Sequence, residues 1–250
     1  MKKIKIFGFL LGCFFLANNA YAQDSANLPV DMNFQIKNMH LWRGIQVTNE
    51  LMSDVDVHFM DKNKVWKVGV WGGAGVNGVY KEFDYYVSFA KNGFSAAVWD
   101  IYNFSKGATY NNTDIFNYSA RGTGRFIDAS IGYRFQGSFP LSINWATVVF
   151  GRDRGSENKQ NLYSSYVSLS YPLLRNKVVD VDLGLGGAFA LNPESGTSAN
   201  FYGDKAGITD ISLTATRKVQ LGSFTLPVSV TTALNPVRKE GNIQVAFNLF

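Results

Sequence analysis

Apolar and polar side chains alternate one by one along much of the chain. In the stretch 177–190, Leu183 and Leu185 fall on one face of an extended chain. Asp182 and Gly184 fall on the other face. Because successive side chains of a strand point to opposite sides, this period of two predicts strands with one apolar and one polar face.

The same alternation recurs in twelve segments, most of them close to the 9–11 residues that a tilted strand needs to cross a bilayer. The predicted strands span 31–43, 51–60, 64–73, 82–90, 94–103, 125–136, 141–150, 162–171, 177–190, 207–219, 224–234 and 242–250. Short and long connections alternate between them, and the longest are 104–124, 151–161 and 191–206. This is typical of outer-membrane barrels, with short periplasmic turns and long outer loops. We therefore expect an all-β fold, a transmembrane antiparallel up-and-down β-barrel of about 12 strands.

A secreted soluble β-sandwich is the alternative fold, since its strands also alternate between apolar and polar positions. Small residues on the polar face, such as Gly184 and Gly186, suit a narrow lumen, and aromatic residues gather near the strand ends. The chain also finishes on a strand ending in Phe250. These features favour the barrel.

The N-terminal segment reads as a targeting signal. Three lysines in the first five residues precede the apolar stretch 6–17, and Ala20-Tyr21-Ala22 has the small-x-small form of a cleavage site. We expect a secretory signal peptide at 1–22 and the outer-membrane barrel at 23–250. A lipoprotein signal ending at Cys13 is the alternative.

Removing this segment changes which chemistry the chain can support. Cys13 is the single cysteine of the chain and lies in the segment that is removed. A disulfide framework or a thiolate metal site is therefore not expected. The formal net charge falls from +5 to +2, because three lysines are lost while Asp+Glu stays at 19. That small charge argues against a nucleic-acid partner. With 46% hydrophobic and only 17% charged residues, the chain is neither disordered nor a coiled coil.

Short motifs in the first half of the expected mature chain carry a family resemblance. They are Leu41-Trp42-Arg43-Gly44-Ile45, Asp54-Val55-Asp56-Val57, Val68-Gly69-Val70-Trp71-Gly72-Gly73, Asp84-Tyr85-Tyr86-Val87 and Val98-Trp99-Asp100-Ile101-Tyr102. In these motifs the chain resembles the TorF-type family of outer-membrane porins. The resemblance implies a barrel in the outer membrane and says little about a substrate.

Catalytic signatures are absent from the sequence: it has no G-x-S-x-G elbow, no phosphate-binding loop and no H-E-x-x-H motif. His58 shares a strand face with Asp54 and Asp56, so a lipid-modifying barrel enzyme remains an alternative. Alternate residues of a strand lie about 6.6 Å apart, which is too far for easy chelation. We therefore expect no metal and no cofactor.

Charged residues on the polar phase of the strands are the candidate functional residues. With Lys37 and Arg43 added, the predicted inward set holds eight acids against four bases. The predicted pore-lining residues are Asp54, Asp56, Lys67, Asp84, Asp100, Asp128, Arg134, Asp180, Asp182 and Asp210. Charges at membrane depth are costly unless they are wetted or paired.

This pattern predicts a passive porin-like channel for small polar solutes or cations, with a weak preference for cations. The alternatives are the lipid-modifying enzyme and a structural envelope barrel without transport, plugged by its own side chains. Expected partners are outer-membrane lipid, the barrel-assembly machinery and a small polar solute. The long loops mix aromatic and polar residues, which suits contact with carbohydrate, and Arg152 and Arg154 are candidates for binding lipopolysaccharide phosphate.

Overall fold

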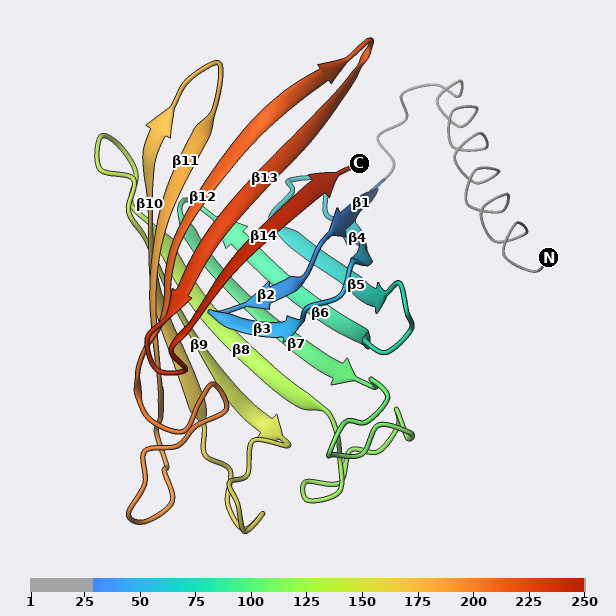
Figure 1. Ribbon diagram of the computed structural model, residues 1–250, viewed down its shortest axis with the longest axis vertical. Coiled ribbons are helices and arrows are strands. Elements are labelled where there is room, and N and C mark those ends of the chain that lie inside the picture. The colour runs from blue at the N-terminus through green and yellow to red at the C-terminus, as the bar shows by residue number, and fades with distance from the viewer. Residues whose placement is uncertain (1–28, 250) are drawn as a thin grey trace, which may run out of the picture.

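The computed structural model describes residues 29–249 and shows a closed antiparallel barrel of twelve strands (Figure 1). The expected signal peptide at 1–22 lies outside the described residues. The wall consists of β1 (Val30–Lys37), β4 (Met52–Met60), β5 (Trp66–Gly75), β6 (Lys81–Lys91), β7 (Phe94–Asn103), β8 (Phe126–Arg134), β9 (Ser142–Gly151), β10 (Ser164–Arg175), β11 (Asp180–Ala190), β12 (Gly207–Leu221), β13 (Phe224–Asn235) and β14 (Glu240–Asn248).

Each wall strand pairs with its neighbours in chain order, and β1 closes the barrel between β14 and β4. The closing seam is short, because β1 and β14 pair only through Gln35–Asn248, Ile36–Phe247 and Lys37–Ala246. The predicted all-β, twelve-stranded up-and-down barrel is confirmed, and the β-sandwich is excluded. Residues 29–249 contain no helix long and apolar enough to cross a membrane.

The prediction of one continuous first strand over 31–43 is wrong. β1 ends at Lys37, which pairs directly with Met52 at the start of β4. Between them, residues 38–51 form a separate hairpin of β2 (His40–Trp42) and β3 (Ile45–Thr48). At its tip Arg43 and Gly44 have φ angles of 52° and 76°, which suit a tight two-residue turn. Alternation continues through this turn, so the period alone cannot separate wall strand from hairpin.

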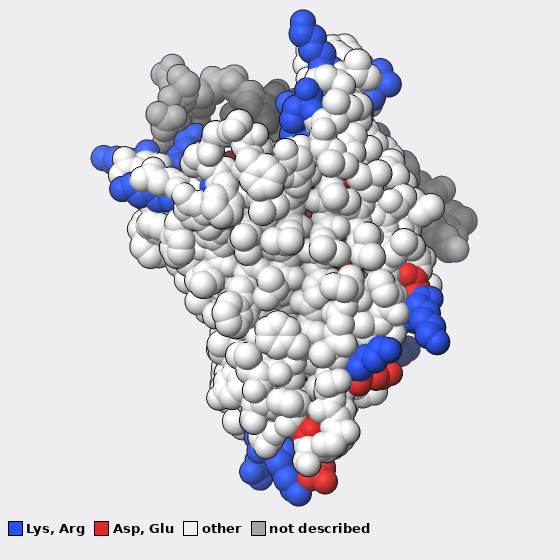
Figure 2. Space-filling view, turned by 90° about the vertical axis from the view of Figure 1, so that its left-hand side faces the viewer, with Lys and Arg blue, Asp and Glu red and all other residues white. Residues whose placement is uncertain are grey.

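The outer face of the barrel is apolar. Val68, Ile131 and Ile243 are 55–57% exposed there, and many other large hydrophobic residues share that face. Figure 2 shows one side of this surface as a broad belt almost free of Lys, Arg, Asp and Glu, with charged side chains at the two ends and along one edge. The inward positions of the wall include many polar residues, and Asp84 and Asp128 are 4% and 1% exposed. The barrel thus has an apolar outer surface and charged residues inside, which is the opposite of a water-soluble protein.

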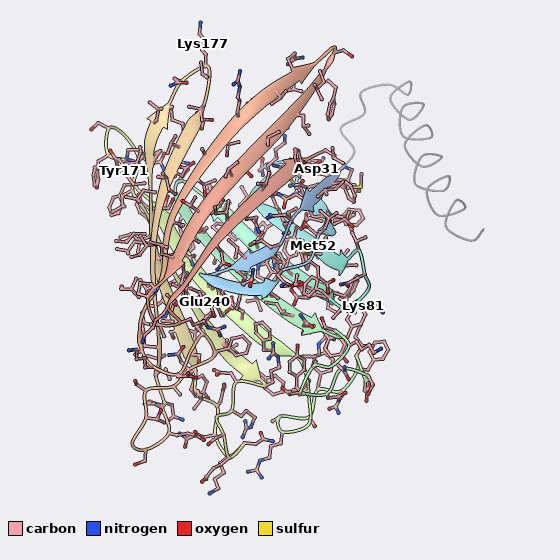
Figure 3. All side chains as sticks on the ribbon, viewed as in Figure 1. Asp31, Met52, Lys81, Tyr171, Lys177 and Glu240 are labelled. Atoms are coloured by element: carbon pink, nitrogen blue, oxygen red, sulfur yellow. The ribbon has the colours of Figure 1, made fainter. Side chains whose placement is uncertain are left out.

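The two ends of the barrel differ in the length of their connections. At the turn end, the strands are joined by 61–65, 92–93, 135–141, 176–179 and 222–223. At the loop end they are joined by 76–80, 104–125, 152–163, 191–206 and 236–239. Figure 3 marks the turn end with Lys177. The three long loops lie within two residues of their predicted bounds.

Candidate functional site

The barrel interior holds a cavity of about 800 Å³ between the wall and the hairpin 38–51. Its lining comes from β1, from the arc β4–β8, from the hairpin and from loop-end residues such as Tyr110 and Arg152. The hairpin occupies part of the lumen, because its residues contact strands on distant parts of the wall.

The tip of the hairpin is held by a buried ion pair. Arg43 Nη1 and Nη2 donate to Asp128 Oδ1 and Oδ2 on β8 at 2.8 and 2.6 Å. Arg43 Nη1 also donates to the hydroxyl of Tyr202 at 2.6 Å. Two parallel bonds between a guanidinium and a carboxylate are among the stronger polar contacts in proteins. The pair therefore fixes the hairpin across the lumen.

Gly44 brings the tip against the far wall. A Cβ atom at Gly44 would lie 1.8 Å from the carbonyl oxygen of Thr209 on β12. The side chain of Asn235, at the end of β13, donates to the Gly44 carbonyl at 2.9 Å. Only glycine permits this approach at a positive φ angle.

The base of the hairpin carries a second buried ion pair. Lys37 Nζ lies 2.8 Å from Asp54 Oδ2, and both side chains are less than 10% exposed. Trp71 Nε1 donates to the same carboxylate at 3.3 Å. His40 stacks on the Trp71 ring with centroids 5.6 Å apart. Charge and aromatic stacking together hold the entry of the hairpin to β4 and β5.

An aromatic cluster lies at the loop end of the lumen. Trp42 of the hairpin packs against Phe126 of β8 and against Phe201 and Tyr202 of the loop 191–206. The ring centroids lie 5.5–6.2 Å apart. The interior at this end is therefore partly apolar, which the alternating pattern alone did not indicate.

Arg152 lies at the edge of this cluster, just after β9. Its guanidinium carbon is 3.9 Å from the centroid of Tyr110, 4.7 Å from that of Phe201 and 5.0 Å from that of Phe126. Among the described residues no carboxylate lies within 4.0 Å of it, and its buried Nε has no hydrogen-bond partner. Burial lowers the pKa of Arg152, and Tyr110, Glu82 and Asp153 act in the opposite direction.

Two acids of β6, Glu82 and Asp84, line the cavity without forming an ion pair in the described part of the chain. Asn103 Nδ2 donates to Glu82 at 3.0 Å, and the Tyr102 backbone N–H donates to Asp84 at 3.2 Å. Glu82 lies on the same strand face as Asp84, two residues earlier. That spacing was the sequence signal by which Glu82 could have been included in the predicted set.

The strand register puts nine of the ten predicted residues on the inward face. Of these, Asp54, Asp56, Asp84 and Asp128 line the cavity. The others do not contribute to it, and lie elsewhere on the inward face: Lys67, Arg134, Asp180, Asp182 and Asp210. Asp182 forms an exposed ion pair with Arg175, and Asp210 accepts a hydrogen bond from Tyr166 at 3.2 Å.

Asp100 faces outward, against the prediction. It pairs across the sheet with Tyr85 and Ile127, whereas its chain neighbours Trp99 and Ile101 line the cavity. Arg125 Nε donates to Asp100 at 2.6 Å, and Tyr118 of the loop 104–125 donates to it at 2.7 Å. The inward side chains of β7 are largely aromatic and aliphatic, because they face the aromatic cluster at the loop end. A prediction that places the polar side chains of this strand inward therefore selects the wrong face.

The charges around the cavity are balanced, in contrast to the predicted excess of acids. Five acids line it: Asp54, Asp56, Glu82, Asp84 and Asp128. Five bases also line it: Lys37, Arg43, Lys106, Arg152 and Arg238. The predicted pore-lining set does not include the last three bases, because loop residues cannot be assigned to a lumen by alternation.

His58 forms no hydrolytic triad among residues 29–249. Its Nδ1 lies 2.5 Å from Asp56 Oδ1, and the Tyr86 hydroxyl donates to the same oxygen at 3.0 Å. No serine hydroxyl is hydrogen-bonded to His58 in this part of the chain. Within the same residues, no group of three or more His, Cys, Asp or Glu side chains is arranged to hold a metal ion.

The two loop arginines do not act as a pair. Arg152 is directed into the aromatic cluster, whereas Arg154 Nε donates to Asn158 Oδ1 at 2.9 Å within its own loop. The two side chains therefore have different surroundings, and phosphate binding by Arg152 or Arg154 stays a prediction.

Comparisons with known proteins return solved structures of channels at low similarity. No family model and no curated protein matches the chain. An outer membrane channel from Pseudomonas putida F1 is 11% identical, with 90% of this chain and 98% of that chain covered at a TM-score of 0.48. Salmonella typhi OmpF in complex with daunomycin is 8% identical, with 88% and 97% covered at 0.40. A BenF-like porin from Pseudomonas fluorescens Pf-5 is 7% identical, with 90% and 64% covered at 0.34. The likeness to the TorF-type family thus stays a resemblance, and what this chain does must be inferred from its own residues.

Proposed function

We propose that the protein is an outer-membrane channel that passes small polar solutes by diffusion, with the hairpin 38–51 narrowing its lumen. One observation carries the proposal: a closed barrel with an apolar exterior surrounds a cavity of about 800 Å³ lined by charged side chains. A closed barrel satisfies every wall hydrogen bond internally, which lipid requires of a spanning structure.

The apolar exterior supports the membrane location. Exposed Val, Leu, Ile and Phe side chains on most wall strands would cost free energy in water, at about 25 cal/mol per Å² of apolar surface. Lipid removes that cost. The proposed location therefore implies outer-membrane lipid as the surrounding medium and the barrel-assembly machinery as the route of insertion.

The polar lining supports passage of solutes. The ion pairs Lys37–Asp54 and Arg43–Asp128 neutralise part of the wall charge. Because acids and bases around the cavity are equal in number, we propose neutral and zwitterionic polar solutes as the main permeants, and a preference for cations weaker than the predicted set implies.

Swelling of proteoliposomes tests the proposal. Liposomes containing the refolded protein should swell in an isotonic solution of a small sugar, and liposomes with heat-denatured protein should not. Faster gel migration of the unboiled form should accompany the activity. Recovery of the mature chain as a soluble monomer contradicts the membrane location, and absence of swelling contradicts the channel.

A structural barrel without transport is the second candidate. The anchored hairpin and the aromatic cluster at the loop end favour it, because both occupy the lumen. Folded protein in liposomes that do not swell is the outcome that selects this candidate.

A further inference from the structure

Half of the ten charged residues around the cavity have a close polar partner of the opposite kind, and three of the enclosed ones do not. Lys37 pairs with Asp54, Arg43 pairs with Asp128, and Asp56 lies 2.5 Å from His58. Within residues 29–249, Glu82, Asp84 and Arg152 line the cavity without an ion pair. Lys106 and Arg238 also lack one, but their side chains are exposed to solvent. The unpaired enclosed charges are therefore two acids on β6 and one guanidinium after β9.

The surroundings of Arg152, the unpaired base, suit the binding of an anion. Three aromatic rings surround the guanidinium of Arg152 at 3.9–5.0 Å and restrict its position. Aromatic faces leave the N–H groups of the fork unsatisfied, and a carboxylate is the group that such a fork binds best. A small anion entering the cavity would meet a donor that is already oriented.

The unpaired acids provide the complementary half. Asn103 and the backbone of Tyr102 hold one oxygen of Glu82 and one of Asp84, so each carboxylate keeps capacity to accept further bonds. Residues two apart on a strand place their side chains on one face, about 6.6 Å apart. An ammonium group between them would donate charge-assisted hydrogen bonds to both carboxylates.

Part of the remaining lining is aromatic and aliphatic. Trp42, Trp99, Ile101, Phe126 and Phe201 face the same cavity as the unpaired charges. Such a surface binds the apolar part of a solute, while the charged groups fix its orientation.

We propose that the cavity is a binding site for a small zwitterion with an apolar side group, whose carboxylate pairs with Arg152 and whose ammonium pairs with Glu82 and Asp84. This inference rests on the proposed function, since a solute reaches the cavity through the channel. The site would bind this class of solute during its passage through the channel.

A ligand series with the wild-type protein tests the site without any substitution. The full chain in detergent is titrated with L-phenylalanine, with 3-phenylpropionate, which lacks the ammonium, and with 2-phenylethylamine, which lacks the carboxylate. Three of the five tryptophans line the cavity, so their fluorescence reports occupancy. L-Phenylalanine should bind at least about tenfold more tightly than either analogue. Equal binding of all three, or no binding, overturns the proposal.

Substitutions then assign the two halves of the site. In Arg152→Gln, 2-phenylethylamine should bind as well as L-phenylalanine, because the carboxylate has lost its partner. In the double variant Glu82→Gln with Asp84→Asn, 3-phenylpropionate should bind as well as L-phenylalanine. Arg154→Gln is the matched control, because Arg154 belongs to the same loop but bonds to Asn158. A variant that keeps wild-type ligand discrimination while migrating as a folded barrel contradicts the role of its residue.

Swelling measured on the same preparations separates this inference from the proposed function. Permeation of sugars without selective binding of L-phenylalanine overturns the zwitterion site and leaves the channel. Selective binding without permeation contradicts the channel and supports the site.

Discussion

Two arcs of the barrel wall differ in their inward residues and in how they contact the hairpin. On the arc β4–β8, the inward positions include five acids, and these lie around the cavity. On the arc β10–β13, the facing positions are mostly Gly, Ser, Thr and Ala, as at Gly184, Gly186 and Ser212, and its inward acids Asp180, Asp182 and Asp210 do not line the cavity. The acidic arc binds Lys37, just before the hairpin, through Asp54 and binds the hairpin tip through Asp128, whereas the small-residue arc contacts the tip by close backbone approach at Thr209.

This difference shows that the hairpin and the acidic arc depend on each other. A carboxylate buried as deeply as Asp128 needs a partner, and the hairpin provides it as Arg43. The hairpin tip in turn packs closely against the opposite arc at the Thr209 carbonyl, where only glycine fits at position 44. Perturbing either contact should release the hairpin, and the two perturbations should differ in size.

Breaking the buried ion pair should have the largest effect. Arg43→Met leaves Asp128 buried and unpaired, which we expect to lower the free energy of unfolding by about 3–5 kcal/mol. Urea unfolding in lipid vesicles measures the change. Asp182→Asn is the control, because its pair with Arg175 is exposed, and it should cost about 0–1 kcal/mol. Equal costs at the two sites would show that the hairpin pair contributes no more than a surface contact.

Adding a methyl group at the hairpin tip tests the small-residue arc. Gly44→Ala combines a positive φ angle with a Cβ 1.8 Å from the Thr209 oxygen, so we expect a loss above the about 1–2 kcal/mol of the backbone strain alone. Gly222→Ala is the matched control, because φ is 63° there and nothing lies within 4 Å. The same unfolding assay compares them. A Gly44→Ala cost no larger than that of Gly222→Ala would contradict docking of the tip on β12.

Ion selectivity distinguishes the two faces of the acidic arc. Asp84→Asn removes a charge from the cavity and should move the reversal potential in a salt gradient toward anions. Asp100→Asn removes the same charge from the outer face, beside Arg125, and should leave the potential unchanged. A shift with Asp100→Asn as large as that with Asp84→Asn would mean that the register of β7 differs from the one described.

A loop contact at the loop end should respond to pH with the smallest effect. Backbone N–H groups of Ser156 and Glu157 donate to Glu194 and hold its pKa below the ordinary 4.5. A lowered pKa means that the contact is fully present above pH 4.5 and is lost as the pH falls through the folded value. Glu194→Gln imitates the protonated state at neutral pH and should speed tryptic cleavage at Lys159. Asp204→Asn is the control, because Asp204 is an exposed acid of the same loop as Glu194 without an ion pair among residues 29–249. Equal cleavage rates in both variants would contradict the contact.

Alternation predicted the wall well and failed where the interior stops being polar. On β4 and β11, inward Asp and Gly alternate with outward Val and Leu, and the predicted faces agree with the register. On β7 the inward Trp99 and Ile101 face other apolar groups, so Asp100 was assigned to the wrong side. Arg152 reaches the cavity through loop packing, which no local pattern encodes.

Removing the hairpin tests the central claim most directly. Lys37 and Met52 are directly paired, so Asn-Gly in place of residues 38–51 joins β1 to β4 through a two-residue turn. Single-channel conductance in planar bilayers compares this variant with the wild type. We predict small conductance for the wild type and a several-fold larger one for the variant, because the obstruction inside the lumen is gone. The same conductance in both proteins, with the variant folded, would contradict a lumen narrowed by the hairpin.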